Sequence, residues 1–112
     1  MIFVIDDDLT MAKCIKRACG RADVRIFANA IEAMELIARG ELPELIFLDI
    51  LLDGPDGFTF LNELVSYVDT SKISVVIVSS LDFSGRDLSN YGVVGILNKE
   101  TMTPEEILAY VK

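Results

Sequence analysis

The stretch LIFLDILLDGPDG, Leu45 to Gly57, decides the fold. It begins as an uninterrupted apolar run that ends at Asp49, and it continues into a segment rich in Gly, Pro and Asp. Such a run, bounded by turn-forming residues, is typical of a strand with both faces buried. Taken alone, an aspartate at the end of such a strand could be a helix cap, a metal ligand or a nucleophile.

Four other short apolar runs predict further strands, at residues 2–5, 23–27, 73–80 and 93–98. Helical periodicity between them predicts helices at 9–19, from Asn29 to Gly40, at 58–68, weakly at 83–90, and after Thr103. This alternation predicts an α/β fold, a doubly wound five-stranded parallel sheet with helices on both faces. We expect one domain over residues 1–112, because the chain is too short for a second core.

Polar residues are expected to begin these helices, and apolar residues to face the core. Asp8 is a candidate cap of the first helix, Asn29 with Glu32 predicts a capping box, and Thr103, Pro104 and Glu106 predict another. The positions expected to face inward are Met11, Ile15 and Ala18 in the first helix, Ile31, Met34, Ile37 and Ala38 in the second, and Phe60, Leu61, Leu64, Val65 and Val68 in the third. Cys14 and Cys19 are expected to be small apolar filler, not a disulfide or a metal site.

Composition excludes several classes of function. The formal net charge of -8 argues against binding nucleic acid or anionic membranes through a basic face, and it suits a cation or a basic partner. The chain has no histidine, which excludes Ser-His-Asp and Cys-His catalysis and any His-ligated metal. No apolar run approaches the roughly 20 residues that span a bilayer, and no signal peptide is recognisable. We therefore expect a cytoplasmic location.

The predicted strand ends carry the chemistry. In this fold ligands bind beyond the carboxyl ends of the strands, where Asp6 and Asp7, Asp49, Ser79 and Ser80, and Lys99 should meet. Clustered carboxylates repel each other unless a cation intervenes, and Mg²⁺ suits a partly hydrated carboxylate site. An amine and a hydroxyl would complete the surroundings of a phosphoryl group. Each residue alone could be a cap, a turn residue or a surface residue, so the prediction depends on their convergence.

Four motifs resemble those of the receiver domain of two-component response regulators, which has the CheY-like (flavodoxin-like) fold. They are VIDDD around Asp6 and Asp7, LIFLDILLDGPDG around Asp49, VIVSS ending at Ser80, and GILNK ending at Lys99. The order and spacing of these motifs are also similar to the family's, over the whole chain.

The resemblance implies a phosphorylatable switch. Asp49 would accept a phosphoryl group from a sensor histidine kinase or phosphotransfer protein, and the change would pass to a downstream protein or output domain. Mg²⁺ would be held by Asp6, Asp7, Asp49 and the carbonyl of Leu51, with Asp6 acting through water. The phosphoryl oxygens would be bound by Lys99, the Ser79 hydroxyl and the backbone N–H groups of Leu51 and Ser80.

Several residues depart from the family pattern. Asp53 replaces a usual proline, Glu100 replaces the proline after the lysine, and Ile96 occupies the position of the aromatic switch residue. We expect a trans bond between Lys99 and Glu100. Leu51 and Leu81 occupy the positions that tune dephosphorylation in this family, and because both are apolar we expect slow self-dephosphorylation.

Two alternatives stay open. One is a degenerate receiver that binds a protein partner without phosphorylation. The other is a Mg²⁺-dependent phosphatase of the haloacid dehalogenase type, which needs a second aspartate two residues after the nucleophile. That position is Leu51 after Asp49 and Asp8 after Asp6. The receiver itself is expected to be a switch and not an enzyme.

Overall fold

A computed structural model describes residues 1–49, 60, 62–64, 72–80 and 92–111. It contains five strands, β1 (Ile2–Ile5), β2 (Val24–Phe27), β3 (Leu45–Asp49), β4 (Ser74–Ser79) and β5 (Val93–Asn98). Its complete helices are α1 (Leu9–Cys19), α2 (Ala30–Ala38) and α4 (Pro104–Leu108), and residues 60 and 62–64 are also helical. The predicted helix at 83–90 lies outside the described residues.

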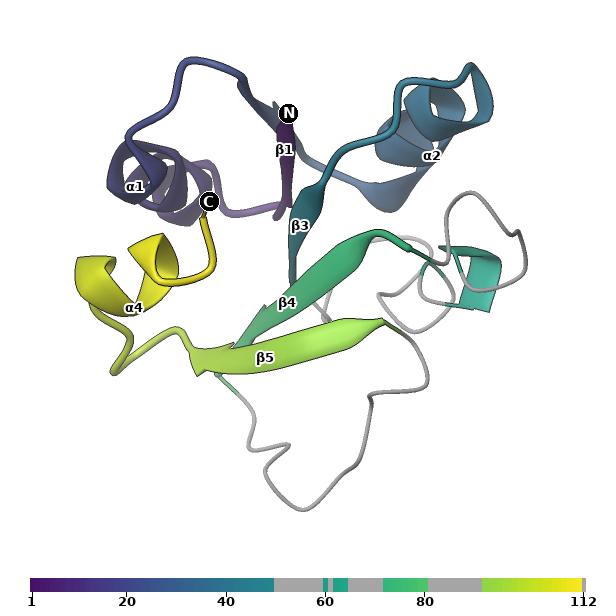
Figure 1. Ribbon diagram of the computed structural model, residues 1–112. Helices are drawn as coiled ribbons and strands as arrows, with labels where there is room; N and C mark the ends of the chain where they lie inside the picture. The colour runs from purple at the N-terminus through teal and green to yellow at the C-terminus, as the bar shows by residue number, and fades with distance from the viewer. Residues whose placement is uncertain (50–59, 61, 65–71, 81–91, 112) are drawn as a thin grey trace.

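All five strands are parallel, in the order β2-β1-β3-β4-β5. Figure 1 shows α1 and α4 on one side of this sheet and α2 on the other. The predicted doubly wound sheet is therefore confirmed. The strand order reverses between β1 and β3, which makes the carboxyl ends of these two strands the expected place for a site.

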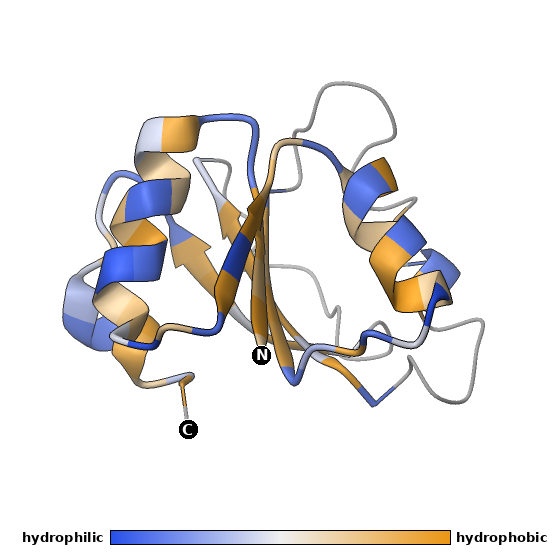
Figure 2. Cartoon of the chain, turned by 90° about the horizontal axis from the view of Figure 1, so that it is seen from above, coloured by the Kyte–Doolittle hydropathy of each residue, from blue (hydrophilic) through white to orange (hydrophobic). Residues whose placement is uncertain are grey.

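The core has two parts, one on each face of the sheet. β1 is fully buried and supplies Ile2 and Val4 to the α1 and α4 face, and Phe3 and Ile5 to the α2 face. The strands are accordingly mainly apolar in Figure 2, with a hydrophilic stretch in the edge strand β2, where Arg25 is exposed, while the helices alternate apolar and polar stretches. This double burial is the physical reason that the strands read as continuous apolar runs.

Local signals place the helix ends as predicted. The Asp8 side chain accepts the N–H groups of Thr10 and Met11, and Gly20 ends α1 in the left-handed conformation, with φ 66°. The capping box at Thr103 is complete. At Asn29 only half of the predicted box forms, because the Asn29 side chain accepts the Glu32 N–H with no return bond between these two described residues.

The buried helix faces are rotated from the predicted ones. α1 buries Ala12, Ile15 and Cys19, while Met11 and Ala18 lie at the edge of the contact. α2 buries Ala30, Ala33 and Ile37, so the prediction is wrong for Ile31, which is 52% exposed, and for exposed Ala38. Two small alanines on the buried face let α2 approach the sheet closely, while Met34 packs at the margin of the core. Phe60 and Leu64 are buried as predicted, while Leu61, Val65 and Val68 lie outside the described side chains.

Cys14 is a second correction, since it is exposed and fills no apolar space, whereas Cys19 is buried as predicted. Both thiols are free, which agrees with the expectation of no disulfide. In the described part of the chain, no helix has the length and apolar character that crossing a membrane requires.

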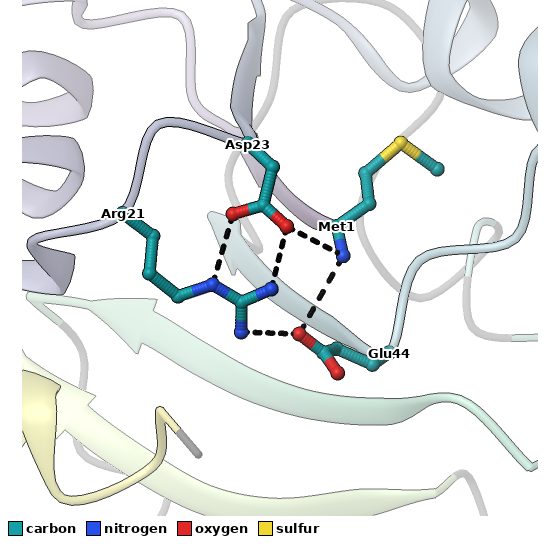
Figure 3. A network of polar contacts seen from close by, with 4 residues as sticks. All are labelled: Met1, Arg21, Asp23 and Glu44. Atoms are coloured by element: carbon teal, nitrogen blue, oxygen red, sulfur yellow. Dashed lines mark hydrogen bonds and ion pairs between the residues drawn. The ribbon is translucent and has the colours of Figure 1, made fainter.

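An ion-pair network ties together the opposite, amino edge of the sheet (Figure 3). Arg21 Nε donates to Asp23 Oδ1 at 2.8 Å, and the same guanidinium also pairs with Glu44. The Met1 amino group lies 3.0 Å from Asp23 Oδ2 and 3.5 Å from Glu44 Oε1. These contacts connect the starts of β1, β2 and β3, and the sequence analysis did not foresee them.

Candidate functional site

Three aspartates converge at the carboxyl edge of the sheet. Asp6 follows β1 and Asp49 ends the neighbouring β3, and the parallel register sets Ile5 beside Leu48. Carboxylate oxygens of Asp6, Asp7 and Asp49 all lie within 4.8 Å of one another. Asp6 and Asp49 are buried, at 2% and 4% exposed, whereas Asp7 is exposed. The structure thus brings together the three predicted carboxylates where the strand order reverses.

Lys99 supplies the positive charge at this cluster. It directly follows β5, and its Nζ lies 3.1 Å from Asp49 Oδ2 and 3.2 Å from Asp6 Oδ2. The Lys99 side chain is only 19% exposed, so both ion pairs are partly shielded from water. A lysine 50 residues away in sequence reaches Asp49, as the convergence argument predicted.

Burial and charge set the protonation behaviour of the cluster. Burial raises the pKa of Asp6, and the nearby Asp49 raises it further, while the Asp8 N–H and the Lys99 charge only partly oppose this. Burial by itself would lower the pKa of Lys99, but its hydrogen bond to Asp49 and the charges of Asp6 and Asp49 outweigh that cost and raise it. Lys99 therefore stays protonated, and Asp6 resists ionisation.

One oxygen of Asp6 is buried without a hydrogen-bond donor. Asp6 Oδ1 accepts the Asp8 N–H at 2.9 Å, which holds the side chain in place. Asp6 Oδ2 is buried and accepts no hydrogen bond, although the Lys99 ammonium is close enough for an ion pair. The Lys99 ammonium donates instead to Asp6 Oδ1, at 3.4 Å. A buried carboxylate oxygen without a donor, beside two further carboxylates, fits a hard cation such as Mg²⁺.

Ser79 and Ser80 lie at the end of β4, the strand beside β3. Ser79 is 1% exposed, and its carbonyl accepts the Lys99 N–H at 3.1 Å, which joins the ends of β4 and β5. Ser80 is exposed at the strand terminus. Both serines therefore lie at the edge that carries the aspartates and Lys99.

Asn98 is a positioning residue that the sequence analysis missed. Its side chain accepts the Glu100 N–H at 2.8 Å, and its carbonyl accepts the N–H groups of Thr101 and Met102. These bonds turn the chain immediately around Lys99 and fix where that side chain begins. An asparagine at the end of a strand is a recognised turn signal, so the sequence did contain the clue.

Two of the residues that depart from the family pattern, Ile96 and Glu100, lie in or just after β5. The described peptide bonds are all trans, including the bond between Lys99 and Glu100, which confirms that prediction. Ile96 is partly buried and packs against the core on the α2 face. The structure does not describe Leu51 and Asp53, which follow β3 in the sequence, or Leu81.

Comparison with known proteins agrees with this geometry. The chain matches the response regulator receiver domain family over residues 2–112. It is also 40% identical over 86 residues to the response regulator PleD of Caulobacter vibrioides, a match that covers 75% of this chain and 19% of PleD. The chain thus spans only about a fifth of the length of this curated relative.

Solved structures share the fold. A putative response regulator from Chloroflexus aurantiacus has a TM-score of 0.82 at 26% identity, over 96% of this chain and 90% of that one. The receiver domain of NtrX from Brucella abortus has a TM-score of 0.81 at 22% identity, over 97% of this chain and 92% of that one. Because the family matches this chain over nearly the whole chain length, the chain belongs to the response regulator receiver domain family.

Proposed function

We propose that this receiver is a phosphorylatable switch in which Asp49 is the phosphoryl acceptor. The observation that carries the proposal is the contact of Lys99 Nζ with Asp49 Oδ2 at 3.1 Å, beside Asp6 and Asp7. A carboxylate held this way has its nucleophilic oxygens at the sheet edge and a cation ready for the incoming charge. The phosphodonor is a phosphohistidine of a sensor histidine kinase or a phosphotransfer protein.

The transfer exchanges one bond to phosphorus for another. An Asp49 oxygen attacks the phosphorus, the P–N bond of the phosphohistidine breaks, and an acyl phosphate forms. The Lys99 ammonium then binds a phosphoryl oxygen in place of the Asp49 oxygen it now contacts. The Ser79 hydroxyl, with backbone N–H groups of Leu51 and Ser80, donates to the remaining oxygens.

Asp6, Asp7 and Asp49, with the carbonyl of Leu51, would hold Mg²⁺. The bound cation supplies charge neutralisation for the carboxylates and for the phosphoryl oxygens. The unsatisfied Asp6 Oδ2 supports this assignment. Phosphorylation would then alter contacts through Ser79 and the loops at this edge, since Ile96 offers no aromatic ring, and so change binding of a downstream protein or output domain.

Labelling with a small phosphodonor tests the acceptor. The protein is incubated with acetyl phosphate and MgCl2, and intact mass spectrometry should find one base-labile phosphoryl group that EDTA prevents. Asp49→Ala should abolish the label, whereas Asp8→Ala, which removes a helix cap at the same edge, should keep it. A label that persists in Asp49→Ala would refute the assignment.

The same experiment separates the alternatives. Absence of both labelling and Mg²⁺ binding would favour a degenerate receiver that docks a partner without phosphorylation. Multiple turnover of a phosphomonoester would favour a phosphatase of the haloacid dehalogenase type. The described site argues against the degenerate receiver, because Lys99 pairs with both Asp6 and Asp49 and one oxygen of each of the three carboxylates lies within 4.8 Å of the others.

Self-dephosphorylation should be slow, because Leu51 and Leu81 cannot orient a water molecule by hydrogen bonding. The double variant Leu51→Asn/Leu81→Glu should shorten the lifetime of the Asp49 phosphoryl group, measured by mass spectrometry after the donor is removed. A wild-type half-life of seconds, or an unchanged lifetime in the variant, would contradict this reasoning.

A further inference from the structure

An apolar stripe of α2 at the margin of the core lines a groove. Ile31, Met34 and Ala38 follow one another at helical spacing and all line the groove, and Met34 also packs against the core. Ile31 is 52% exposed, Ala38 is exposed and Met34 is only partly buried. An isolated exposed apolar residue needs no explanation, but three in one row on a helix form a continuous surface.

This α2 groove lies between the stripe and the helical residues at 60 and 62–64, and has a volume of about 420 Å³. Its apolar lining includes Ala30, Met34, Ala38 and the buried Phe60. It is open to solvent along α2, and its size falls within the range of about 300–1,000 Å³ of specific ligand sites. None of its described lining residues belongs to the aspartate cluster.

Two glutamates flank the apolar surface of the groove. Glu35 from α2 and Glu63 from the neighbouring helical residues both line it. Neither has an ion pair among the described residues, and the chain as a whole has a net charge of -8. Charge complementarity therefore requires a basic occupant. A second copy of this chain would bring its own acidic rim, and an anionic lipid surface would be repelled in the same way.

We propose that the α2 groove docks an amphipathic helix of a partner protein, with an apolar stripe bordered by Lys or Arg. The stripe from Ile31 to Ala38 extends over two turns, about 10 Å at 1.5 Å per residue. A helix lying along it presents side chains at the same spacing, and the exposed Ala38 permits close approach. The lysines or arginines of the partner then reach Glu35 and Glu63. This docking does not require phosphorylation of Asp49.

A designed peptide probes the groove directly. The probe is a helical peptide with leucines at i, i+3 and i+7 and lysines on both sides, added to the ¹⁵N-labelled protein in EDTA. The largest amide shifts should fall on α2. Ile31→Asp should weaken binding at least roughly tenfold, as expected for a central apolar contact. Leu108→Asp on α4 is the matched control, because Leu108 is also 52% exposed, and it should leave affinity unchanged.

Charge reversal at the groove glutamates provides a second, independent test of the proposal. Glu35→Lys/Glu63→Lys should abolish binding, whereas Glu32→Lys/Glu105→Lys makes the same change in net charge outside the groove and should weaken binding only slightly. Circular dichroism establishes that each variant is folded before its affinity is compared.

Three results would overturn the proposal. Equal binding of a peptide with the same lysines but a scrambled leucine pattern would show nonspecific attraction to an acidic protein. Peptide-induced shifts confined to surfaces other than α2 would place the contact elsewhere. Shifts on α2 that depend on protein concentration without peptide would identify a second copy of this chain as the occupant.

Discussion

Replacing Lys99 by methionine tests whether one ammonium holds the aspartate cluster together. Methionine keeps most of the apolar stem and removes only the charge that lies 3.1 Å from Asp49 and 3.2 Å from Asp6. Breaking a buried ion pair costs about 3–5 kcal/mol, and because Lys99 is 19% exposed we take the lower end, about 3 kcal/mol. The unfolding entropy of a 112-residue domain is about 0.24 kcal/mol/K, so the expected fall in Tm is about 12 °C.

Magnesium should reverse most of that loss. Without the ammonium the carboxylates are less well neutralised, so the variant gains more from a cation than the wild type does. A ligand at 100 times its Kd stabilises the folded state by about 2.7 kcal/mol, which nearly offsets the substitution. The increase in Tm on adding saturating MgCl2 should therefore be larger in Lys99→Met than in wild type.

Thermal melts by circular dichroism, in EDTA and in MgCl2, measure both effects. Lys72→Met is the matched control, because Lys72 is exposed just before β4 and makes no ion pair among the described residues. It should change Tm little in either buffer. A Lys99→Met variant that melts with wild type in EDTA would refute the electrostatic argument, as would a smaller response to Mg²⁺ than in wild type.

Three further substitutions test other parts of the structure. Asp6→Asn should raise the Tm of the metal-free protein at neutral pH by a few degrees, at roughly 4 °C per kcal/mol. Because the pKa of Asp6 is raised in the folded state, the stability of the wild type falls as pH rises through that pKa. Thermal melts in EDTA from pH 4 to 8 should therefore show a smaller fall in Tm for the variant than for the wild type. Arg21→Met should reduce the loss of stability on acidification, because Arg21 lowers the pKa values of Asp23 and Glu44 in the folded state. The stability that these pairs contribute is present above the unfolded pKa values near 4 and is lost as pH falls through the lowered, folded pKa values. If the variant and the wild type lose stability equally in acid, the ion-pair network of Figure 3 is not the cause of that loss. Gly95→Ala should cost about 1–3 kcal/mol, because the new Cβ would clash with the ring and hydroxyl of Tyr110, and Tyr110→Ala should remove most of that cost in a double-mutant cycle by urea unfolding.

The sequence predicts the sheet and its chemistry well for one physical reason. Strands buried on both faces have a pattern that no other element matches at that length, and parallel connections then bring their carboxyl ends together. Asp6, Asp49 and Lys99 are therefore placed at one edge by strand ends alone. The direction of each strand can be predicted without knowing how the side chains pack. The structure agrees with the predicted convergence of the strand ends.

Side-chain direction is harder to predict. In α2 both Ala30 and Ile31, and both Ile37 and Ala38, are apolar, so two adjacent faces of the helix are equally plausible from periodicity. The structure buries the face with more alanine, because it allows close contact with the sheet. The pairing of Arg21 with Glu44 is likewise invisible in sequence, since it depends on two surface side chains 23 positions apart that meet only when the strand starts are aligned.

The aspartate cluster shows why such a site is poised to bind a cation. With every group ionised, three carboxylates and one ammonium leave two uncompensated negative charges at one strand edge. Burial makes that excess costly, and the raised pKa of Asp6 is its direct expression. The fold tolerates this cost because β1 is apolar and buried throughout and β3 is apolar and buried up to Asp49. If the cluster holds Mg²⁺ as proposed, substitutions that relieve this excess charge should stabilise the metal-free protein and weaken Mg²⁺ binding together.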